Sequence, residues 1–167
     1  VDSMVTGESG MVLGILTADC APVLFADRTA GIIGAAHAGW RGARAGVVEA
    51  CIDEMIAMGG TLSNIDVAIG PCIAQASYEV GPEFYQDFMD EDAAHDDFFK
   101  ASKRPGHFQF DLSGYIERRL SRQGLASVTA LNVDTCADPE RFYSYRRCTL
   151  NGEKDYGRLL SAIVIED

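Results

Sequence analysis

The feature that most constrains the fold is a change from strand-like to helix-like spacing of apolar residues early in the chain. Residues 11–18 are almost wholly apolar, which predicts a buried strand. Two more strands are expected over residues 22–26 and 32–36. Apolar residues then recur at helical spacing over residues 47–56, and the glycine pair at 59–60 is typical of a helix end. The sequence therefore predicts a sheet packed against helices.

The remainder of the chain continues this mixture. Asp111 is expected to cap a helix that runs to Leu120 and stops by Gly124. Several strands follow one another through tight turns, so we predict an α+β fold (mixed α/β), with mixed β-sheets packed with helices. Further helices are expected over residues 83–89 and 139–145, and further strands over residues 65–69, 108–110, 128–133 and 159–165.

Length and composition indicate one globular domain over residues 1–167. Hydrophobic residues make up 47% of the chain and charged residues 23%, as in ordinary soluble proteins. No apolar run approaches the roughly 18 residues that span a bilayer, and the start does not resemble a signal peptide. We therefore expect a cytoplasmic protein with no membrane partner. The chain enters a buried strand almost at once, so we expect the domain to be N-terminally incomplete.

The net charge of −11 disfavours a nucleic-acid partner, because a polyanion would be repelled. The five cysteines are odd in number and contain no C-x-x-C pair, which fits reduced thiols better than a disulfide scaffold or a zinc ribbon. Histidine is scarce, with three in the chain.

Cys20 and His37 each end an apolar strand, and only a short strand and a turn separate them. Their side chains are therefore candidate neighbours. A cysteine and a histidine can form a nucleophile–base pair or provide two ligands to zinc. The residues alone leave a third interpretation open, in which the thiol serves packing and the imidazole is structural.

Four segments of the chain resemble the YfiH-like laccase-domain family, which is also called the purine nucleoside phosphorylase or multicopper polyphenol oxidoreductase family. The resemblance covers nearly the whole chain in the same order, and its Cys20 and His37 segments are the most specific. The segments are T-A-D-C-A-P-V at 17–23, A-H-A-G-W-R-G at 36–42, G-P-C-I at 70–73 with Y-E-V-G at 78–81, and R-F-Y-S-Y-R-R at 141–147.

The resemblance implies a zinc held by Cys20, His37 and a second histidine of a Q-V-H segment, which residues 1–17 do not contain. Zinc is thus the expected cofactor, with copper as the alternative. Arg41, beside His37, is the first candidate for binding an anion or substrate, and Arg146 is the second. Asp19 is a candidate for orienting a ligand or transferring a proton.

Cys72 follows another strand end and is a further candidate for lining the substrate site, although packing is its ordinary role. The catalytic set is thus Cys20, His37, Arg41 and Asp19, and the substrate-binding set is Arg41, Arg146 and Cys72.

The activities implied by the resemblance are phosphorolysis of purine nucleosides (adenosine, inosine or guanosine) and deamination of adenosine. A purine nucleoside and phosphate are therefore the expected small-molecule partners. Three alternatives stay open: a copper-dependent, laccase-like polyphenol oxidase, a thiol hydrolase that uses Cys20 and His37, and an inactive binding domain. Three histidines are too few for a multicopper centre, which weighs against the first alternative.

Overall fold

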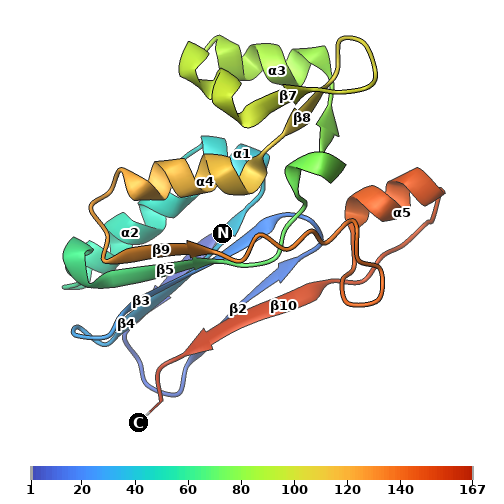
Figure 1. The fold of residues 1–167 in the computed structure, drawn as a ribbon. Coiled ribbons are helices and arrows are strands. Elements are labelled where there is room, and N and C mark those ends of the chain that lie inside the picture. The colour runs from blue at the N-terminus through green and yellow to red at the C-terminus, as the bar shows by residue number, and fades with distance from the viewer. Residues whose placement is uncertain (1, 167) are drawn as a thin grey trace.

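The computed structural model describes residues 2–166 and confirms the mixed α+β fold. Its centre is a five-stranded sheet, in which neighbouring strands are antiparallel except for the parallel pair β5–β9. Helices cover one face of this sheet, and a two-stranded ribbon covers the other (Figure 1). In order across the sheet, the strands are β1 (Ser3–Thr6), β4 (Ile32–Ala38), β3 (Ala21–Asp27), β5 (Ile65–Ile69) and β9 (Ser127–Ala130).

The helical face carries α2 (Val47–Ala57) and α4 (Leu112–Ser121), and both were expected from the sequence. The apolar stripe of α2 packs on β4, where Gly34 allows a close approach. A Cβ atom built at Gly34 would lie 2.8 Å from the Sγ of Cys51. Asp111 caps α4 as predicted, by accepting a hydrogen bond from the Gly114 N–H at 2.9 Å.

The opposite face is covered by the antiparallel ribbon of β2 (Val12–Thr17) and β10 (Leu159–Val164). The strand expected over residues 11–18 is therefore confirmed, but only one of its faces is buried. Leu13 and Ile15 pack beneath the central sheet, whereas Val12 and Leu16 alternate with them and are exposed. The prediction that this strand is buried holds for one face and is wrong for the other, because β2 lies in an outer layer of the described structure.

A third, smaller layer stands above α1 (Trp40–Arg44) and α4 (Figure 1). It holds the sheet β6–β8–β7 and α3. The Trp40 ring of α1 packs against Phe84 of α3, with centroids 4.7 Å apart, so an aromatic cluster joins this layer to the rest of the domain. The bounds are β6 (Glu79–Val80), α3 (Pro82–Met89), η3 (Ala93–Phe98), β7 (Phe99–Ala101) and β8 (Phe108–Phe110), with the short helices η1 (Leu62–Asn64) and η2 (Gln75–Ser77) outside it.

The prediction of a helix over residues 139–145 is wrong. The chain forms turns there, and α5 begins later, at Tyr145–Asn151. Ser144 starts it, because its Oγ accepts a hydrogen bond from the Arg147 N–H at 3.1 Å. The strand expected over residues 128–133 is shorter than predicted, since Asn132 adopts a left-handed backbone with φ of 52°. Within residues 2–166, no helix is both long enough and apolar enough to cross a lipid bilayer.

Asp27 anchors the turn between β3 and β4 and is only 1% exposed. Its carboxylate accepts backbone N–H bonds from Ala30 at 2.9 Å and Thr29 at 3.0 Å, and one from Thr61, beyond α2, at 2.9 Å. The hydrogen bond from Ala30 is the main reason that the pKa of Asp27 lies below its ordinary value, although burial opposes the shift.

We predict that Asp27→Asn lowers the free energy of unfolding by about 1–2 kcal/mol at pH 7, because the charged acceptor is lost. The lowered pKa means that the charge of Asp27 stabilises the fold fully above its unfolded pKa of about 4 and progressively less as the pH falls through the folded pKa. Urea unfolding at pH 7 and pH 3 should therefore show a smaller difference between variant and wild type at pH 3. The exposed Asp53→Asn on α2 is the control, and an equal deficit at both pH values would contradict the prediction.

Candidate functional site

A cavity of about 480 Å³ opens where the ends of several elements meet. Its walls come from the bend between β2 and β3, the end of β4, the helix α1 and the start of α5. Both Cys20 and His37 line it, so the structure brings together the two residues that the sequence singled out. Arg41, Arg146 and Asp19 line the same cavity.

Cys20 and His37 reach the cavity from neighbouring antiparallel strands. His37 faces Pro22 in the register of β3 and β4, and Cys20 lies just before β3. Gly39 lets the chain pass close to the thiol, since a Cβ atom there would lie 2.9 Å from the Sγ of Cys20. Burial, and then the nearby Asp19 carboxylate, raise the pKa of Cys20 in the metal-free protein. Thiolate nucleophiles need the opposite shift.

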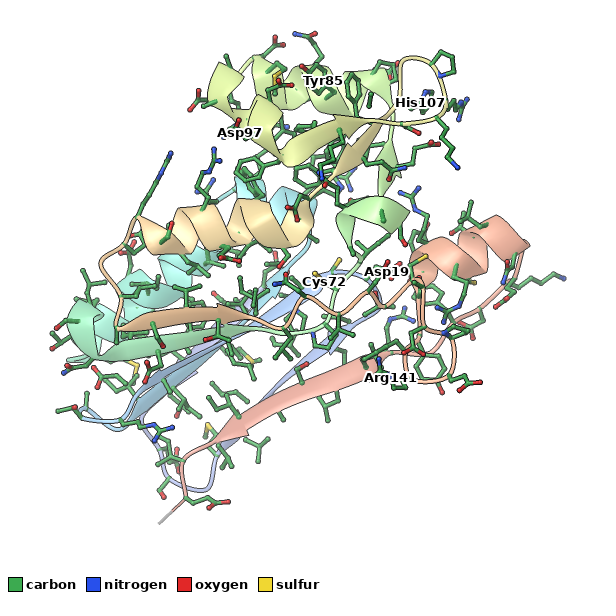
Figure 2. The ribbon with its side chains drawn as sticks, viewed as in Figure 1. Asp19, Cys72, Tyr85, Asp97, His107 and Arg141 are labelled. Carbon is green, nitrogen blue, oxygen red and sulfur yellow. The ribbon has the colours of Figure 1, made fainter. Side chains whose placement is uncertain are left out.

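Asp19 holds the Cys20 bend in place. It is only 7% exposed, and its backbone is left-handed with φ of 85°, a conformation that costs a residue other than glycine about 1–3 kcal/mol. Its Oδ1 accepts a hydrogen bond from the Thr135 hydroxyl at 2.7 Å. Its Oδ2 accepts bonds from the Ser144 hydroxyl at 2.9 Å and the Arg146 N–H at 2.6 Å. Figure 2 shows Asp19 beside the start of α5.

Three donors thus occupy both oxygens of the Asp19 carboxylate, and its backbone carbonyl accepts a bond from the Ile73 N–H at 2.9 Å. This pattern fits a residue that positions Cys20 and Arg146 relative to each other. Of the two roles expected for Asp19, this geometry favours orienting a ligand over transferring a proton.

The two arginines of the cavity differ in how they are held. The Arg41 guanidinium lies 4.4 Å from the Trp40 ring centroid and has no hydrogen bond or ion pair within the described residues. Arg146 donates to the Glu79 carbonyl at 2.8 Å and lies 5.3 Å from the Tyr78 ring centroid. Both charges are therefore available to an anion in the cavity.

Cys72 is not among the residues that line this cavity. Its side chain is buried, and the burial raises the pKa of its thiol to about 12. Figure 2 shows it shortly after the end of β5. Its placement favours packing over the substrate contact that the sequence allowed.

Sequence reasoning did not single out Asp2 or Trp40, which also line the cavity. Asp2 lies close to His37, because the Asp2 carbonyl accepts a hydrogen bond from the His37 N–H at 2.7 Å. No local sequence pattern predicts such a contact. Trp40 lies within the A-H-A-G-W-R-G segment at 36–42. That segment was the signal from which its place in the site could have been predicted. Tyr78 and Tyr145, which belong to two of the family-like segments, also lie in the cavity wall, and burial raises the pKa of Tyr78 to about 12.

A thiol and an imidazole are the donor types that zinc prefers, so Cys20 and His37 fit that metal chemically. Residues 2–166 contain no group of three or more cysteine, histidine, aspartate or glutamate side chains placed to hold one ion. Cys20 and His37 are therefore two donors of the kind that zinc prefers, without a third of these side chains beside them in the described residues.

Residues 1–166 match the family model described as multi-copper polyphenol oxidoreductase laccase. The chain belongs to this family. It is 36% identical over 166 residues to the purine nucleoside phosphorylase RP494 of Rickettsia prowazekii, covering 99% of this chain and 68% of that protein. It is 32% identical to the adenosine deaminase RL5 of an unknown prokaryotic organism, covering 93% of this chain and 60% of that protein.

Among solved structures, the chain superposes on the hypothetical protein YfiH of Bacillus licheniformis with a TM-score of 0.87 and 26% identity. The match covers 99% of this chain and 61% of that one. The chain thus spans roughly two thirds of these relatives' lengths. The resemblance to the laccase-domain family that the four segments indicated is confirmed.

We predict that Asp19→Asn destabilises the protein by about 1–3 kcal/mol, because an amide cannot accept all three hydrogen bonds and leaves a buried donor unpaired. Thr135→Val removes one of the three donors and should cost less. Urea unfolding of both variants tests this order. If Asp19→Asn were as stable as wild type, or less affected than Thr135→Val, Asp19 would not be the anchor of the bend.

Proposed function

We propose that this chain carries the site of a zinc-dependent purine nucleoside enzyme, which catalyses phosphorolysis of adenosine, inosine or guanosine, deamination of adenosine, or both. The observation that carries the proposal is that Cys20, His37 and two arginines line one cavity of about 480 Å³. Cavities of this size accommodate small-molecule ligands. The names of two relatives, a purine nucleoside phosphorylase and an adenosine deaminase, support the same class of substrate.

In this proposal Cys20 and His37 are two of the zinc ligands. Bound zinc lowers the pKa of its water and so supplies hydroxide near neutral pH. Asp19 keeps the Cys20 bend fixed to the start of α5, so that the metal ligands and Arg146 hold a constant spacing. Arg41 and Arg146 bind the phosphate for phosphorolysis and place it beside the nucleoside.

The apolar part of the wall suits a purine ring. Trp40 and Tyr78 present aromatic surface to the cavity, and both are fixed by packing against Phe84, with ring centroids 4.7 and 6.2 Å away. We assign them to the base, because stacking on a rigid aromatic ring orients a planar ligand at low entropic cost.

The other activities receive less support from this site. His37 is the one histidine that lines the cavity in the described structure, whereas multicopper chemistry uses several. A thiol hydrolase requires a thiolate, and the surroundings of Cys20 favour the thiol in the absence of a metal.

We predict that Cys20→Ala and His37→Ala each lower the zinc content of the purified protein and reduce turnover at least about a hundredfold. Turnover is measured as base release from inosine with phosphate and as ammonia release from adenosine without it. Cys136→Ala, at a half-buried cysteine outside the cavity wall, is the matched control and should keep zinc and activity. Zinc near stoichiometry in wild type supports the proposal, copper in its place supports the oxidase, and no turnover of either nucleoside would overturn it.

The two arginines give a separate prediction. Arg41→Ala and Arg146→Ala should each raise the KM for phosphate about tenfold, because each removes a charge-assisted hydrogen bond to the anion. Ammonia release from adenosine needs no phosphate and should change less. Arg141→Ala, which removes an exposed arginine paired with Asp138, is the control. An equal loss of activity in both reactions would mean that the arginines bind the nucleoside or stabilise the fold, and do not bind phosphate.

A further inference from the structure

Asp2 brings to the cavity a carboxylate that the proposed function does not use. It lines the cavity together with His37. Asp2 directly precedes β1, in which Ser3 is the register partner of Ala36 on β4. The hydrogen bond from the His37 N–H to the Asp2 carbonyl at 2.7 Å continues this ladder by one residue. Asp2 and His37 are therefore direct cross-strand neighbours.

The alternation of side chains along the strands decides where these two residues point. In an antiparallel pair, residues directly opposite each other project to the same face of the sheet, with Cβ atoms roughly 4.5–5.5 Å apart. On β4, Ala36 belongs to the core on the helical side, whereas Ala35 packs with Leu13 of the ribbon. His37 is two residues beyond Ala35, so the side chains of His37 and Asp2 both project to the ribbon side of the sheet. Asp2 is exposed, which places it at the rim of the cavity.

The carboxylate of Asp2 is free to bind a ligand. Within residues 2–166, its two oxygens accept no hydrogen bond and form no ion pair. The carboxylate of Asp19, which also lines the cavity, is already used, because three donors occupy its two oxygens. Of the two carboxylates in the described wall, Asp2 is therefore the one that can accept a hydrogen bond from a ligand.

The ligand group that suits Asp2 is neutral and donates hydrogen bonds. An ionised carboxylate can only accept, and its charge repels phosphate, which the proposed function assigns to Arg41 and Arg146. A purine nucleoside offers two kinds of donor, the hydroxyls of the ribose and the N–H groups of the base. An acidic side chain binds the ribose 2′-hydroxyl in dinucleotide-binding folds, so the first kind is a known match for a carboxylate.

The neighbours of Asp2 favour the ribose over the base as its partner. The proposed function assigns the base to the aromatic rings of Trp40 and Tyr78. Asp2 instead lies beside His37 on the sheet. Phosphorolysis cleaves the bond between the base and the ribose, and the 2′-hydroxyl is on the ribose carbon next to that bond. A ribose bound at Asp2 therefore brings the bond that breaks close to His37, a member of the catalytic set.

We propose that Asp2 sets a preference of this site for ribonucleosides over 2′-deoxyribonucleosides, by accepting a hydrogen bond from the ribose 2′-hydroxyl. This role rests on the proposed function, because it takes a purine nucleoside as the ligand of the cavity. A hydrogen bond to a charged acceptor is stronger than one between neutral groups. A nucleoside without the 2′-hydroxyl loses this bond and binds more weakly.

The test is isothermal titration of the chain with inosine and with 2′-deoxyinosine. We expect wild type to bind inosine about tenfold more tightly, because one charge-assisted hydrogen bond separates the two ligands. In Asp2→Ala the affinity for inosine should fall about tenfold, and the preference for inosine should shrink to about onefold. Asp2 is exposed, so the substitution should not disturb folding, which urea unfolding checks. Asp53→Ala, at an exposed aspartate on α2, is the matched control and should leave both affinities unchanged.

A second pair of ligands separates the ribose from the base. Adenosine and purine riboside differ in the amino group of the base, and Asp2→Ala should weaken the binding of both equally. A larger loss for adenosine would assign Asp2 to the base and overturn its role at the ribose. Equal binding of inosine and 2′-deoxyinosine by wild type, or an unchanged preference in Asp2→Ala, would overturn that role and leave the proposed function standing. If wild type bound none of the four nucleosides, the proposed function would fail together with the role of Asp2.

Discussion

The buried carboxylate of Asp19 is the interaction on which the candidate site depends. A charge in the interior is costly unless hydrogen bonds replace the water that it has lost. Three donors do so here, and they come from the Thr135 and Ser144 hydroxyls and from the backbone at Arg146. The same bonds tie the bend that carries Cys20 to the first turn of α5. Without them, neither the left-handed backbone of Asp19 nor the position of Arg146 would be fixed.

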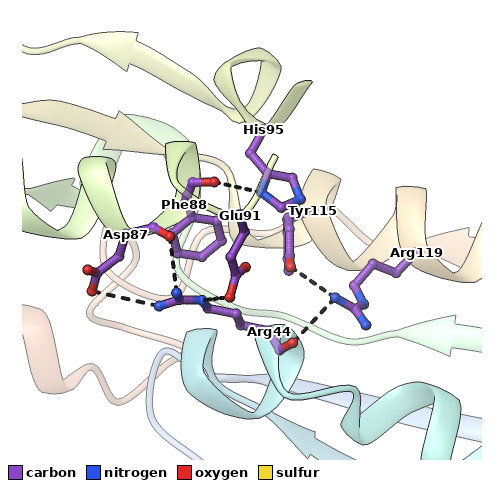
Figure 3. Close-up of polar contacts among 7 residues, drawn as sticks. All are labelled: Arg44, Asp87, Phe88, Glu91, His95, Tyr115 and Arg119. Carbon is purple, nitrogen blue, oxygen red and sulfur yellow. Dashed lines mark hydrogen bonds and ion pairs between the residues drawn. The ribbon is translucent and has the colours of Figure 1, made fainter. Parts of the chain in front are cut away.

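Helix α1 links the parts of the molecule around this anchor. Its first residues, Trp40 and Arg41, face the cavity, and the Arg44 carbonyl accepts a hydrogen bond from Arg119 of α4. The Arg44 side chain pairs with Glu91 at 2.7 Å, so it also reaches the small upper layer (Figure 3). Contacts on three sides thus fix the short helix α1. Its rigidity keeps the Arg41 side chain in a constant position at the cavity.

The elements that the sequence predicted well are those with a complete local signal. The helix α2 has an apolar stripe, and α4 has Asp111 as its cap. The helix predicted over residues 139–145 shows the converse, because the helix begins only where the Ser144 hydroxyl accepts a hydrogen bond from the Arg147 N–H. The short strands β1, β6 and β7 were not predicted. Each has four residues or fewer. β1 and β6 are stabilised by pairing with strands that are distant in the sequence, whereas β7 pairs with the next strand, β8.

By itself, the sequence determined the mixed strand–helix character and the family, and it singled out Cys20 and His37 as candidates, because the signal for each lies in a contiguous segment. The tertiary structure decided which residues share a cavity. Asp19 and Ser144 are 125 positions apart, and Glu49 and Arg119 are 70 apart, yet each pair is in direct contact. Such contacts arise only when packing closes long loops, so no local pattern could reveal the Asp19 anchor or the burial of Cys72.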